Sequence, residues 1–600
     1  MKEAEFVFEV SYEVCNKVGG IYAVIKSKAA RMAEQYGEGY CAVGFYEPSQ
    51  ARLEFDEGQP PAGLAKAFKR LEEDGIKCRY GLWLIAGRPN AILVDVRDYN
   101  IDLNGLKKQL WEDYKIDSLK SDSWFNDPLK WSHATGRLFE ELIDERPYKG
   151  RKVVGHFHEW MSGFAILHIR KLNLPIATVF TTHATMLGRS ISGAGGDLYG
   201  MAAKERKAGR KASVDLARQY NCEDKHTTEV ACAANADVFS TVSEITGREA
   251  EYILGKKPDV LVYNGLDIGK FPEAEELSVL RKRYRDQMRE FLISYFCRYY
   301  YVDFYNIRSM FISGRYEFHN KGLDVYIEAL GRLNRKLKEE KSKKHVVAFI
   351  FVPSGNRGEN VQVLKNKALF EEVHDQVEAS LPEIRDRILE LIVKGEIPDN
   401  VLSDEFLQQA RRLTAHFIEK RGDTPPLCAF ELSYPEEHDM IIQALRKNEL
   451  LNREEDKVKV IFYPAYLSSA DRFIALEYNQ ATLTCDVGVF PSFYEPWGYT
   501  PLETAAQGTL AITTDLAGFG QFIKGKGNGI QVLNVDGVEY RKTVDELYMK
   551  LLEIVHMEKK ELTNRRINAK ELAALADWRF LIENYVKAHD LALERMKNRM

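Results

Sequence analysis

Short apolar runs alternate with amphipathic helical patterns along the first 275 residues of this 600-residue chain. The run at 5–11 (EFVFEVS) is rich in strand-forming residues, and Ile21, Ile25, Ala29 and Met32 then recur at helical spacing. Four further apolar runs follow, at 151–158, 174–184, 236–243 and 257–267. A repeating order of strand, loop and helix is typical of parallel βαβ units. The pattern therefore predicts a parallel α/β domain over residues 1–275.

A second series of the same kind is predicted within residues 301–581, after a charged helical connection at 276–300. Its expected strands are 309–315, 345–355, 457–464, 485–492 and 509–515. A mostly helical, charge-mixed stretch at about 355–456 fits neither series and is interpreted as an insertion. Because ligands bind outside the carboxyl ends of parallel strands, two such domains facing each other would form a ligand cleft.

The overall composition and charge exclude several classes of protein. A net charge of −5 gives no electrostatic case for binding nucleic acid or an anionic membrane. No apolar run approaches the ~20 residues that span a bilayer, and the N-terminus does not resemble a signal peptide. Eight scattered cysteines without a CxxC pair argue against a disulfide scaffold or a zinc ribbon. We therefore expect a cytoplasmic protein without membrane or nucleic-acid partners.

A glycine-containing loop separates the first expected strand from the first helix. Lys17, Gly19 and Gly20 stand there, and adjacent glycines let the backbone approach a phosphate or a sugar. A plain turn would require glycine equally well. The chain contains no GxGxxG fingerprint, which weakens the alternative of a nicotinamide-dependent oxidoreductase.

Cationic side chains follow two other expected strands. His183 and Arg189 come after the run at 174–184, and Arg315 and Lys321 come after the run at 309–315. An arginine fork and a lysine point charge suit a diphosphate. A solvated surface position is the usual alternative for such residues, but their shared placement at strand ends favours a ligand.

The motif HFHEWMSG invites a metal hypothesis through His156, His158 and Glu159. However, the chain lacks both a helical HExxH arrangement and any Asp-x-Asp pair. We therefore favour structural or sugar-contacting roles for these residues and expect no metal site.

The stretch 491–508 (PSFYEPWGYTPLETAAQG) combines a strand end, a loop and the start of a helix. Thr500 is the expected N-cap, with Pro501 at the first helical position and Glu503 at the third. The exposed amides beside Gly498 would form an anion site. Glu503 is then either a capping residue or a ligand contact. Glu495 has no capping role and lies in the loop where a ligand is expected.

Seven motifs of this chain resemble, in order and spacing, those of the eukaryotic-type glycogen synthases, which are UDP-glucose-dependent glycosyltransferases. The motifs are KVGGIYAV, HFHEWMSG, FTTHATMLGR, TVSEIT, YNGLDIGKF, SGRYEFHNKG and GVFPSFYEPWGYTPLE. The resemblance covers about residues 5–585. It implies a GT-B fold, in which two Rossmann-like α/β domains face each other across a cleft. It also implies that the helix at 582–600 crosses back to complete the first, acceptor-side domain, while 301–581 binds the donor nucleotide.

The resemblance further implies an activity and a set of site residues. Glucose would pass from UDP-glucose to the non-reducing-end 4-hydroxyl of an α-1,4-glucan, with retention of configuration and without metal or cofactor. The implied catalytic residues are Glu495, Arg315, Lys321 and His183. The implied substrate-binding residues are Lys17, Gly19, Gly20, Arg189, Tyr478, Trp497, Gly498, Tyr499, Thr500 and Glu503. By the same resemblance, Tyr478 would stack on the uracil ring.

Two departures from the family concern regulation. Family members from animals and fungi carry phosphorylated tails, whereas this chain stops at Met600 without a long tail. The helix at 558–578 keeps Arg565 and Arg566 but lacks other arginines that sense glucose 6-phosphate in the family. We therefore expect no phosphoregulation and leave activation by glucose 6-phosphate open. The insertion resembles the family's oligomerisation region, so we expect a homo-oligomer, with a tetramer as the candidate state. The alternatives to this function are an ADP-glucose-dependent relative and an inactive glucan-binding scaffold.

Overall fold

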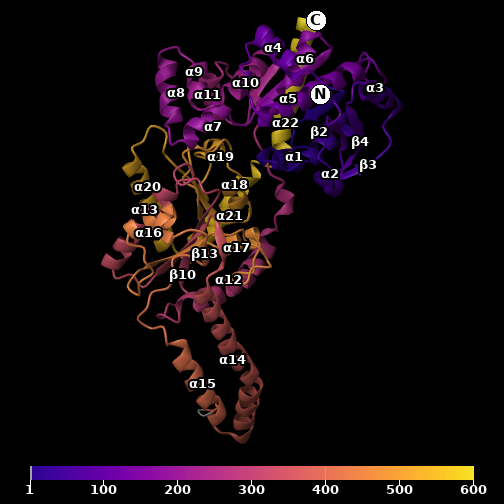
Figure 1. Ribbon diagram of the computed structural model, residues 1–600. Coiled ribbons are helices and arrows are strands. Elements are labelled where there is room, and N and C mark those ends of the chain that lie inside the picture. The colour runs from indigo at the N-terminus through magenta and orange to yellow at the C-terminus, as the bar shows by residue number, and fades with distance from the viewer. Residues whose placement is uncertain (1–2, 399–400) are drawn as a thin grey trace.

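The computed structural model describes residues 3–398 and 401–600, and its described part contains two large sheets. A nine-stranded sheet lies in the first half of the chain and a six-stranded sheet in the second half (Figure 1). All strands of the six-stranded sheet are parallel, and only the β3 and β4 edge of the larger sheet is antiparallel. The expected fold class, two Rossmann-like α/β domains with a helical insertion in the second, is confirmed.

The first domain is built on β1, β6 and β7 at the centre of its sheet. In sheet order its strands are β3 (Phe55–Glu57), β4 (Lys77–Trp83), β5 (Asn90–Asp95), β2 (Tyr40–Phe45), β1 (Phe6–Val10), β6 (Val153–His158), β7 (Ile176–Thr182), β8 (Val238–Thr241) and β9 (Val260–Leu261). Its helices are α1 (Gly20–Tyr36), α2 (Pro48–Glu54), α3 (Ala62–Glu73), α4 (Leu103–Tyr114), α5 (Ser123–Ile143), α6 (Glu159–Lys171), α7 (Met186–Gly193), α8 (Leu198–Lys207), α9 (Val214–Gln219), α10 (Glu223–Asn235) and α11 (Glu244–Ile253).

The helical period predicted for the first helix is confirmed. Ile21, Ile25, Ala29 and Met32 are all buried on the face of α1 that packs against the sheet. The helix ends at Gly37, whose φ of +57° is a conformation that residues with a Cβ rarely adopt. Helix α6 begins at Glu159, directly after β6 ends at His158, so no loop separates the two elements.

The second domain repeats the arrangement on a smaller sheet. In sheet order its strands are β14 (Val458–Tyr463), β11 (His345–Phe351), β10 (Ile307–Ser313), β15 (Val487–Val489), β16 (Leu510–Thr514) and β17 (Ile530–Leu533). Its helices are α13 (Leu323–Glu339), α16 (Met440–Lys447), α17 (Tyr478–Thr484), α18 (Tyr499–Ala506), α19 (Gly518–Ile523), α20 (Tyr540–His556) and α21 (Lys559–Ala574). Strands buried on both faces read as continuous apolar runs, which is why the sequence pattern predicts five of these six strands. It misses β17, in which only the first and last of four residues are buried.

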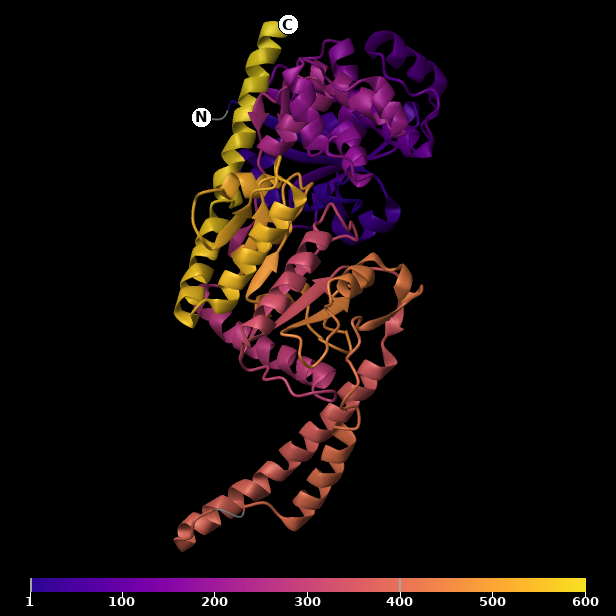
Figure 2. The ribbon, with the colours of Figure 1, turned by 90° about the vertical axis from the view of Figure 1, so that its left-hand side faces the viewer.

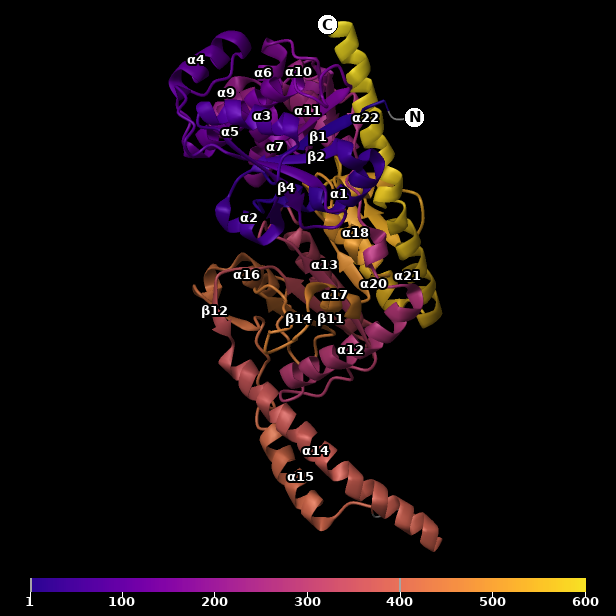
Figure 3. The same cartoon turned by 90° about the vertical axis from the view of Figure 1, so that its right-hand side faces the viewer.

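Four helices lie outside this plan, of which α22 is described below. Helix α12 (Ala274–Phe296) connects the two domains. Helices α14 (Val361–Lys394) and α15 (Asp404–Phe417) form a hairpin that projects away from the body of the molecule (Figure 3). The hairpin is bounded by β12 (Asn356–Glu359) and β13 (Phe430–Leu432), which pair with each other. The insertion therefore begins and ends at a two-stranded ribbon.

The C-terminal helix α22 (Trp578–Arg599) leaves the second domain and runs along the first, as Figure 2 shows. It packs against β6, β7 and α1. Tyr585 and His589 are fully buried there, at 0% exposed. No helix of the described residues is long and apolar enough to cross a membrane.

Candidate active site

The loops after β7, β10 and β15 meet around helix α11 where the two domains touch, and we call this region the interdomain site. Tyr494, in the loop after β15, donates a hydrogen bond from its hydroxyl to Glu249 of α11 at 3.3 Å. The carbonyl oxygen of Pro496 in the same loop accepts from the Ser243 hydroxyl at 2.7 Å. These contacts hold the loop after β15 against the first domain on both sides of Glu495.

Lys321 and Glu495 are in contact in the interdomain site, although 174 positions separate them in the chain. The ammonium group of Lys321 donates to Oε2 of Glu495, and the two side chains are 16% and 20% exposed. Gly322 has a φ of +68°, and a Cβ at this position would collide with the carbonyl oxygen of Pro491. The glycine therefore allows the loops that follow the neighbouring strands β10 and β15 to come together.

Arg315 follows the same strand as Lys321 but has a different partner. Its guanidinium is paired with Glu317 at 2.8 Å, and its side chain is 75% exposed. The structure therefore brings Lys321 to Glu495 and leaves Arg315 in solvent, where it is free to reorient toward an anionic ligand.

Helix α18 begins two residues earlier than predicted, so the expected capping box at Thr500 is wrong. The N-cap is Gly498, with no side chain capping the helix. Gly498 has a φ of +110°, which only glycine adopts without strain, so the chain turns there and not at Thr500. Thr500 and Pro501 consequently lie inside the first turn. Since no side chain caps this turn, its amides keep the positive potential that attracts an anion.

Glu503 therefore has no capping role. Its half-buried carboxylate forms no hydrogen bond or ion pair with any described residue, and burial raises its pKa to about 7. Its charge also raises the pKa of Tyr478, although burial contributes more to that shift. Tyr478 is half-buried at the start of α17, and its hydroxyl lies 2.8 Å from that of Ser313 at the end of β10. A carboxylate without a partner at such a position is a candidate ligand group.

Trp497 and Tyr499 join α18 to the first domain. Trp497 is 3% exposed and packs against Tyr263 and Phe522. The hydroxyl of Tyr499 donates to the carbonyl oxygen of Gly265 at 3.2 Å. The Trp497 ring thus lies in the core between the domains, away from a ligand.

Three buried glutamates from three helices bind the loop that carries His183. The pairs, each from a carboxylate to a backbone amide, are Glu159 with His183 (3.0 Å), Glu249 with Thr185 (2.7 Å) and Glu229 with Met186 (3.1 Å). Burial raises the pKa of Glu159 and that of Glu249 to about 7. Sequence reasoning assigned no role to Glu229 or Glu249, because a glutamate within a helical pattern normally marks an exposed face.

Arg189, on α7, is exposed, and its guanidinium forms no hydrogen bond or ion pair with any described residue. Burial raises the pKa of Glu13, Glu159, Glu229 and Glu249, and the nearby charge of Arg189 opposes the rise in each. The positive charge of Arg189 thus favours the ionised form of these four carboxyl groups, and its guanidinium N–H groups remain able to donate hydrogen bonds to a ligand.

The glycine loop before α1 is exposed at Lys17, Gly19 and Gly20. However, the buried carboxylate of Glu13 accepts hydrogen bonds from the amides of Gly19 and Tyr22, both at 2.8 Å. Two of the amides that a ligand anion would use at this helix end are therefore already paired. The free groups of the loop are the Lys17 side chain and the backbone around Gly20, where a Cβ would meet open space.

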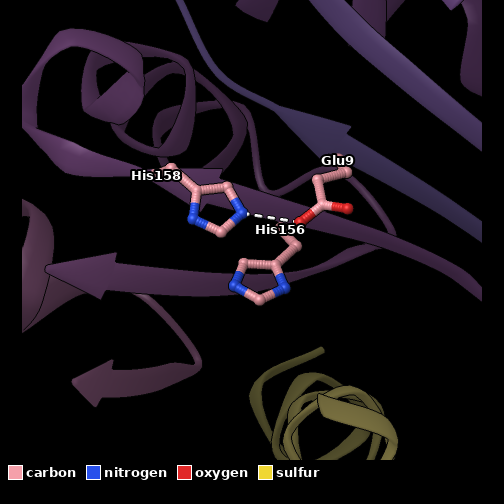
Figure 4. Close-up of side chains that lie close together, drawn as sticks. All are labelled: Glu9, His156 and His158. Atoms are coloured by element: carbon pink, nitrogen blue, oxygen red, sulfur yellow. Dashed lines mark hydrogen bonds and ion pairs between the residues drawn. The ribbon is translucent and has the colours of Figure 1, made fainter. Parts of the chain in front are cut away.

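Glu9, His156 and His158 form the group of potential metal ligands that the structure contains among its described residues (Figure 4). Their ligand atoms lie within 4.8 Å of one another, and all three side chains are buried. The ring nitrogens already have partners, which are Thr181 (2.7 Å) and His589 (3.0 Å) for His156, and Glu9 (2.8 Å) and His183 (3.0 Å) for His158.

The ammonium group of Lys28 also contacts Glu9, and both residues are 0% exposed. A divalent ion in this cluster would displace the histidine partners and lie beside a buried positive charge. The donor set therefore fits a hydrogen-bonded network better than a metal centre.

Residues 9–599 of the chain match the family model described as glycogen synthase. A glycogen [starch] synthase of Caenorhabditis elegans is 35% identical over 612 residues, which cover 99% of this chain and 89% of that protein. Isoform 1 of Saccharomyces cerevisiae and the human liver enzyme are each 34% identical, with 98% and 99% of this chain covered and 86% and 84% of theirs. The fold and these matches define the class of protein as a glycosyltransferase. Within that class, the chain belongs to the glycogen synthase family.

Proposed function

We propose that the enzyme transfers glucose from UDP-glucose to the 4-hydroxyl at the non-reducing end of an α-1,4-glucan, with retention of configuration and without a metal ion. The contact between Lys321 and Glu495 carries this proposal. It places a fixed cation and a fixed carboxylate together at the carboxyl ends of two donor-domain strands. A sugar diphosphate bound in this position would have the Lys321 ammonium beside its diphosphate and the Glu495 carboxylate beside its sugar.

Breaking the bond between C1 of glucose and the diphosphate oxygen leaves negative charge on UDP and positive character on the sugar. Lys321, the exposed Arg315 and the uncapped amides of α18 are groups that stabilise the leaving diphosphate. Glu495 would hold sugar hydroxyls and stabilise the cationic sugar. The acceptor oxygen then bonds to C1, and its proton passes to the departing phosphate oxygen on the same face.

The groups on the first domain would bind the sugar. The guanidinium of Arg189, on α7, is exposed without a partner among the described residues, and His183 is 6% exposed in the loop that leads into this helix. We assign Glu503 and Tyr478 to the nucleotide, because both lie beside the end of β10 and Glu503 has no internal partner. Lys17 would contact the donor from the glycine loop.

Incorporation of radiolabelled glucose into glycogen tests this proposal. The purified enzyme is given UDP-glucose or ADP-glucose, each with and without EDTA and glucose 6-phosphate. We expect incorporation from UDP-glucose that EDTA does not reduce, and α-linked product by NMR. A preference for ADP-glucose would favour the related donor specificity, and loss of activity with EDTA would refute the metal-independent mechanism. No incorporation from either donor would favour an inactive glucan-binding scaffold.

The projecting α14–α15 hairpin supports a homo-oligomer. Its exposed apolar side chains are Val377, Leu381, Leu389, Ile392 and Val393, and Ile397 follows α14 in the same way. A row of exposed apolar residues on a projecting hairpin is typical of a surface that packs against another chain. We propose that a second copy covers it. We also place the reaction in the cytoplasm, which suits the eight free cysteines.

A further inference from the structure

Three buried side chains connect the core of the first domain to the interdomain site. Glu9 lies on β1, His158 ends β6 and His183 follows β7, and these three strands are neighbours in the sheet. Nε2 of His158 is 2.8 Å from Oε1 of Glu9, and Nδ1 of His158 is 3.0 Å from Nε2 of His183. The exposed fractions are 0% for Glu9, 1% for His158 and 6% for His183.

The direction of hydrogen bonding along this chain follows from the charge at its inner end. Burial opposes ionisation of Glu9, but the ammonium of Lys28 and the hydrogen bond from His158 lower its pKa below the ordinary value. The hydroxyl of Tyr40 also donates to Glu9. An ionised carboxylate only accepts hydrogen bonds, so the proton of the Glu9–His158 bond is on Nε2 of His158.

The positions of the protons on His158 and His183 then follow, one after the other. Burial lowers the pKa of His158 and that of His183, so both rings are neutral. A neutral His158 with its proton on Nε2 has a bare Nδ1, which accepts from Nε2 of His183. His183 therefore carries its proton on Nε2, and its Nδ1 is a bare acceptor without a partner among the described residues.

We propose that Glu9 and His158 are positioning residues that hold His183 as a hydrogen-bond acceptor for a hydroxyl of the donor sugar. The inference rests on the proposed function of His183 at the sugar. In this tautomer His183 cannot act as a general acid at the leaving group, because its only proton is committed to His158. A buried, oriented acceptor of this kind positions a sugar hydroxyl without reorganisation during the reaction.

The neighbouring side chains His156 and Lys28 do not compete for the hydrogen bond between His158 and His183. His156 stacks on His158 with ring centres 4.5 Å apart, but both of its nitrogens are bound to Thr181 and His589. The ammonium of Lys28 lies 3.8 Å from the ring centre of Tyr585, on α22, which encloses the charged end of the chain. Both ring nitrogens of His156 and both of His158 are therefore paired, which leaves Nδ1 of His183 as the unpaired ring nitrogen of these three histidines among the described residues.

Two substitutions of His158 separate its hydrogen bond to Glu9 from its hydrogen bond with His183. In His158→Gln the amide nitrogen reaches the Nε2 position and still donates to Glu9, but nothing accepts from His183. In His158→Asn the side-chain oxygen occupies the Nδ1 position and still accepts from His183. We expect kcat/KM for UDP-glucose to fall on the order of 10²-fold in His158→Gln and by less than about tenfold in His158→Asn.

The affinity for UDP shows whether His158 positions His183 or only stabilises the folded protein. UDP has no glucose hydroxyls, so its Kd is expected to stay within about threefold of wild type in both variants. A parallel loss of UDP affinity in His158→Gln, or equal kcat/KM in the two variants, would overturn the proposal. If the wild-type enzyme itself does not use UDP-glucose, the proposed function fails first, which is a separate result.

A second variant and a spectroscopic measurement do not depend on substitutions at His158. In Glu9→Gln/Lys28→Met the buried pair is replaced by neutral side chains of similar size, so the fold is expected to survive while the His158 tautomer is no longer fixed. The same loss of kcat/KM is expected, and activity within threefold of wild type would contradict the mechanism. In wild-type protein labelled with ¹⁵N-histidine, His183 is expected to show an unprotonated Nδ1, with His183→Gln assigning the signal. A proton on Nδ1 would also overturn the proposal.

Discussion

Glu249 accepts a hydrogen bond from the hydroxyl of Tyr494 at 3.3 Å, although the two residues belong to different domains. The same oxygen of Glu249 accepts from both the amide and the hydroxyl of Thr185, each at 2.7 Å. Glu249 therefore joins the loop that carries His183 to the loop that carries Glu495. Any movement of one domain against the other must break or rebuild this connection, so it couples domain closure to assembly of the site.

We first predict that Tyr494→Phe lowers kcat/KM for the sugar nucleotide by about fivefold. The substitution removes one hydrogen bond, for which a net contribution of about 1 kcal/mol is typical. Steady-state kinetics measure the effect. Tyr326→Phe is the matched control, because the Tyr326 hydroxyl is buried in the second domain without a hydrogen-bond partner among the described residues. An unchanged rate in Tyr494→Phe would show that the bond is not made in the reacting complex.

The second prediction concerns the cation and the carboxylate of the site. Lys321→Ala and Glu495→Gln are each expected to lower kcat by at least 10²-fold, because each removes a fixed charge that stabilises the transition state. The kinetic constants for donor and acceptor measure the loss. Near-wild-type turnover in either variant would refute the assigned roles.

Arg315→Ala tests whether the exposed guanidinium turns toward a bound diphosphate. We expect a loss of at least tenfold in kcat/KM for the donor, although Arg315 is paired with Glu317 in the structure. Arg446→Ala is the control, because Arg446 is also an exposed arginine paired with a glutamate, Glu436, at 2.8 Å. Equal behaviour of the two variants would leave Arg315 as a surface residue.

Local patterns predict the parts of this fold that depend on neighbouring residues in the sequence. The period of Ile21, Ile25 and Ala29 predicts α1, and the run at 345–355 predicts β11, because burial of one face or of both faces leaves its mark on the apolar pattern. The start of α18 is not predicted correctly. There the φ of Gly498 decides where the helix begins, and the Thr500–Glu503 spacing carries no information about that angle.

The sequence predicts site residues that are polar and follow directly after a strand. It does not predict the residues that hold those side chains in place. Lys321 and Glu495 stand out in the sequence for their loops, and the structure brings them together. Glu249 and Glu229 do not stand out, because only the tertiary fold turns these helix positions toward the His183 loop. Glu9 reads as an ordinary polar position of a strand until Lys28 and His158 are placed beside it.

The fourth prediction is a pH dependence of stability that originates at Glu503. Its pKa in the folded protein is about 7, raised from 4.5 by burial, so the folded state holds a proton that the unfolded state has released between these values. The stabilising contribution is complete below pH 4.5 and is lost as the pH rises through 7. We therefore expect Glu503→Gln to have the same Tm as wild type at pH 4.5–5 and a Tm about 2–4 °C higher at pH 8.

Differential scanning fluorimetry at a fixed scan rate measures this difference, and the low-pH sample is its internal control. Some pH dependence will persist in Glu503→Gln, because burial also raises the pKa of Glu159 and that of Glu249 to about 7. A constant Tm difference across the whole range would mean that Glu503 is ionised in the folded protein throughout.

The fifth prediction is that the α14–α15 hairpin holds the oligomer together. Leu389 and Val393 are four residues apart on α14, so they share one face of the helix, and they are 55% and 87% exposed. Leu389→Glu/Val393→Glu places two charges on a face that would otherwise be buried against a second copy. We expect the molar mass from size-exclusion chromatography with light scattering to fall from an oligomer to a monomer.

Leu53→Glu is the matched control, because Leu53 is an equally exposed leucine, at 74%, on α2 of the first domain. It should leave the molar mass unchanged. The hairpin projects away from the interdomain site, so turnover measured at low glucan concentration should stay within about twofold of wild type in all three proteins (Figure 3). An unpaired carboxylate is costly to bury against leucine and valine, so an oligomer built on this face should not tolerate Leu389→Glu/Val393→Glu. A monomeric wild-type enzyme, or a double variant that remains oligomeric, would show that the exposed apolar face serves another partner.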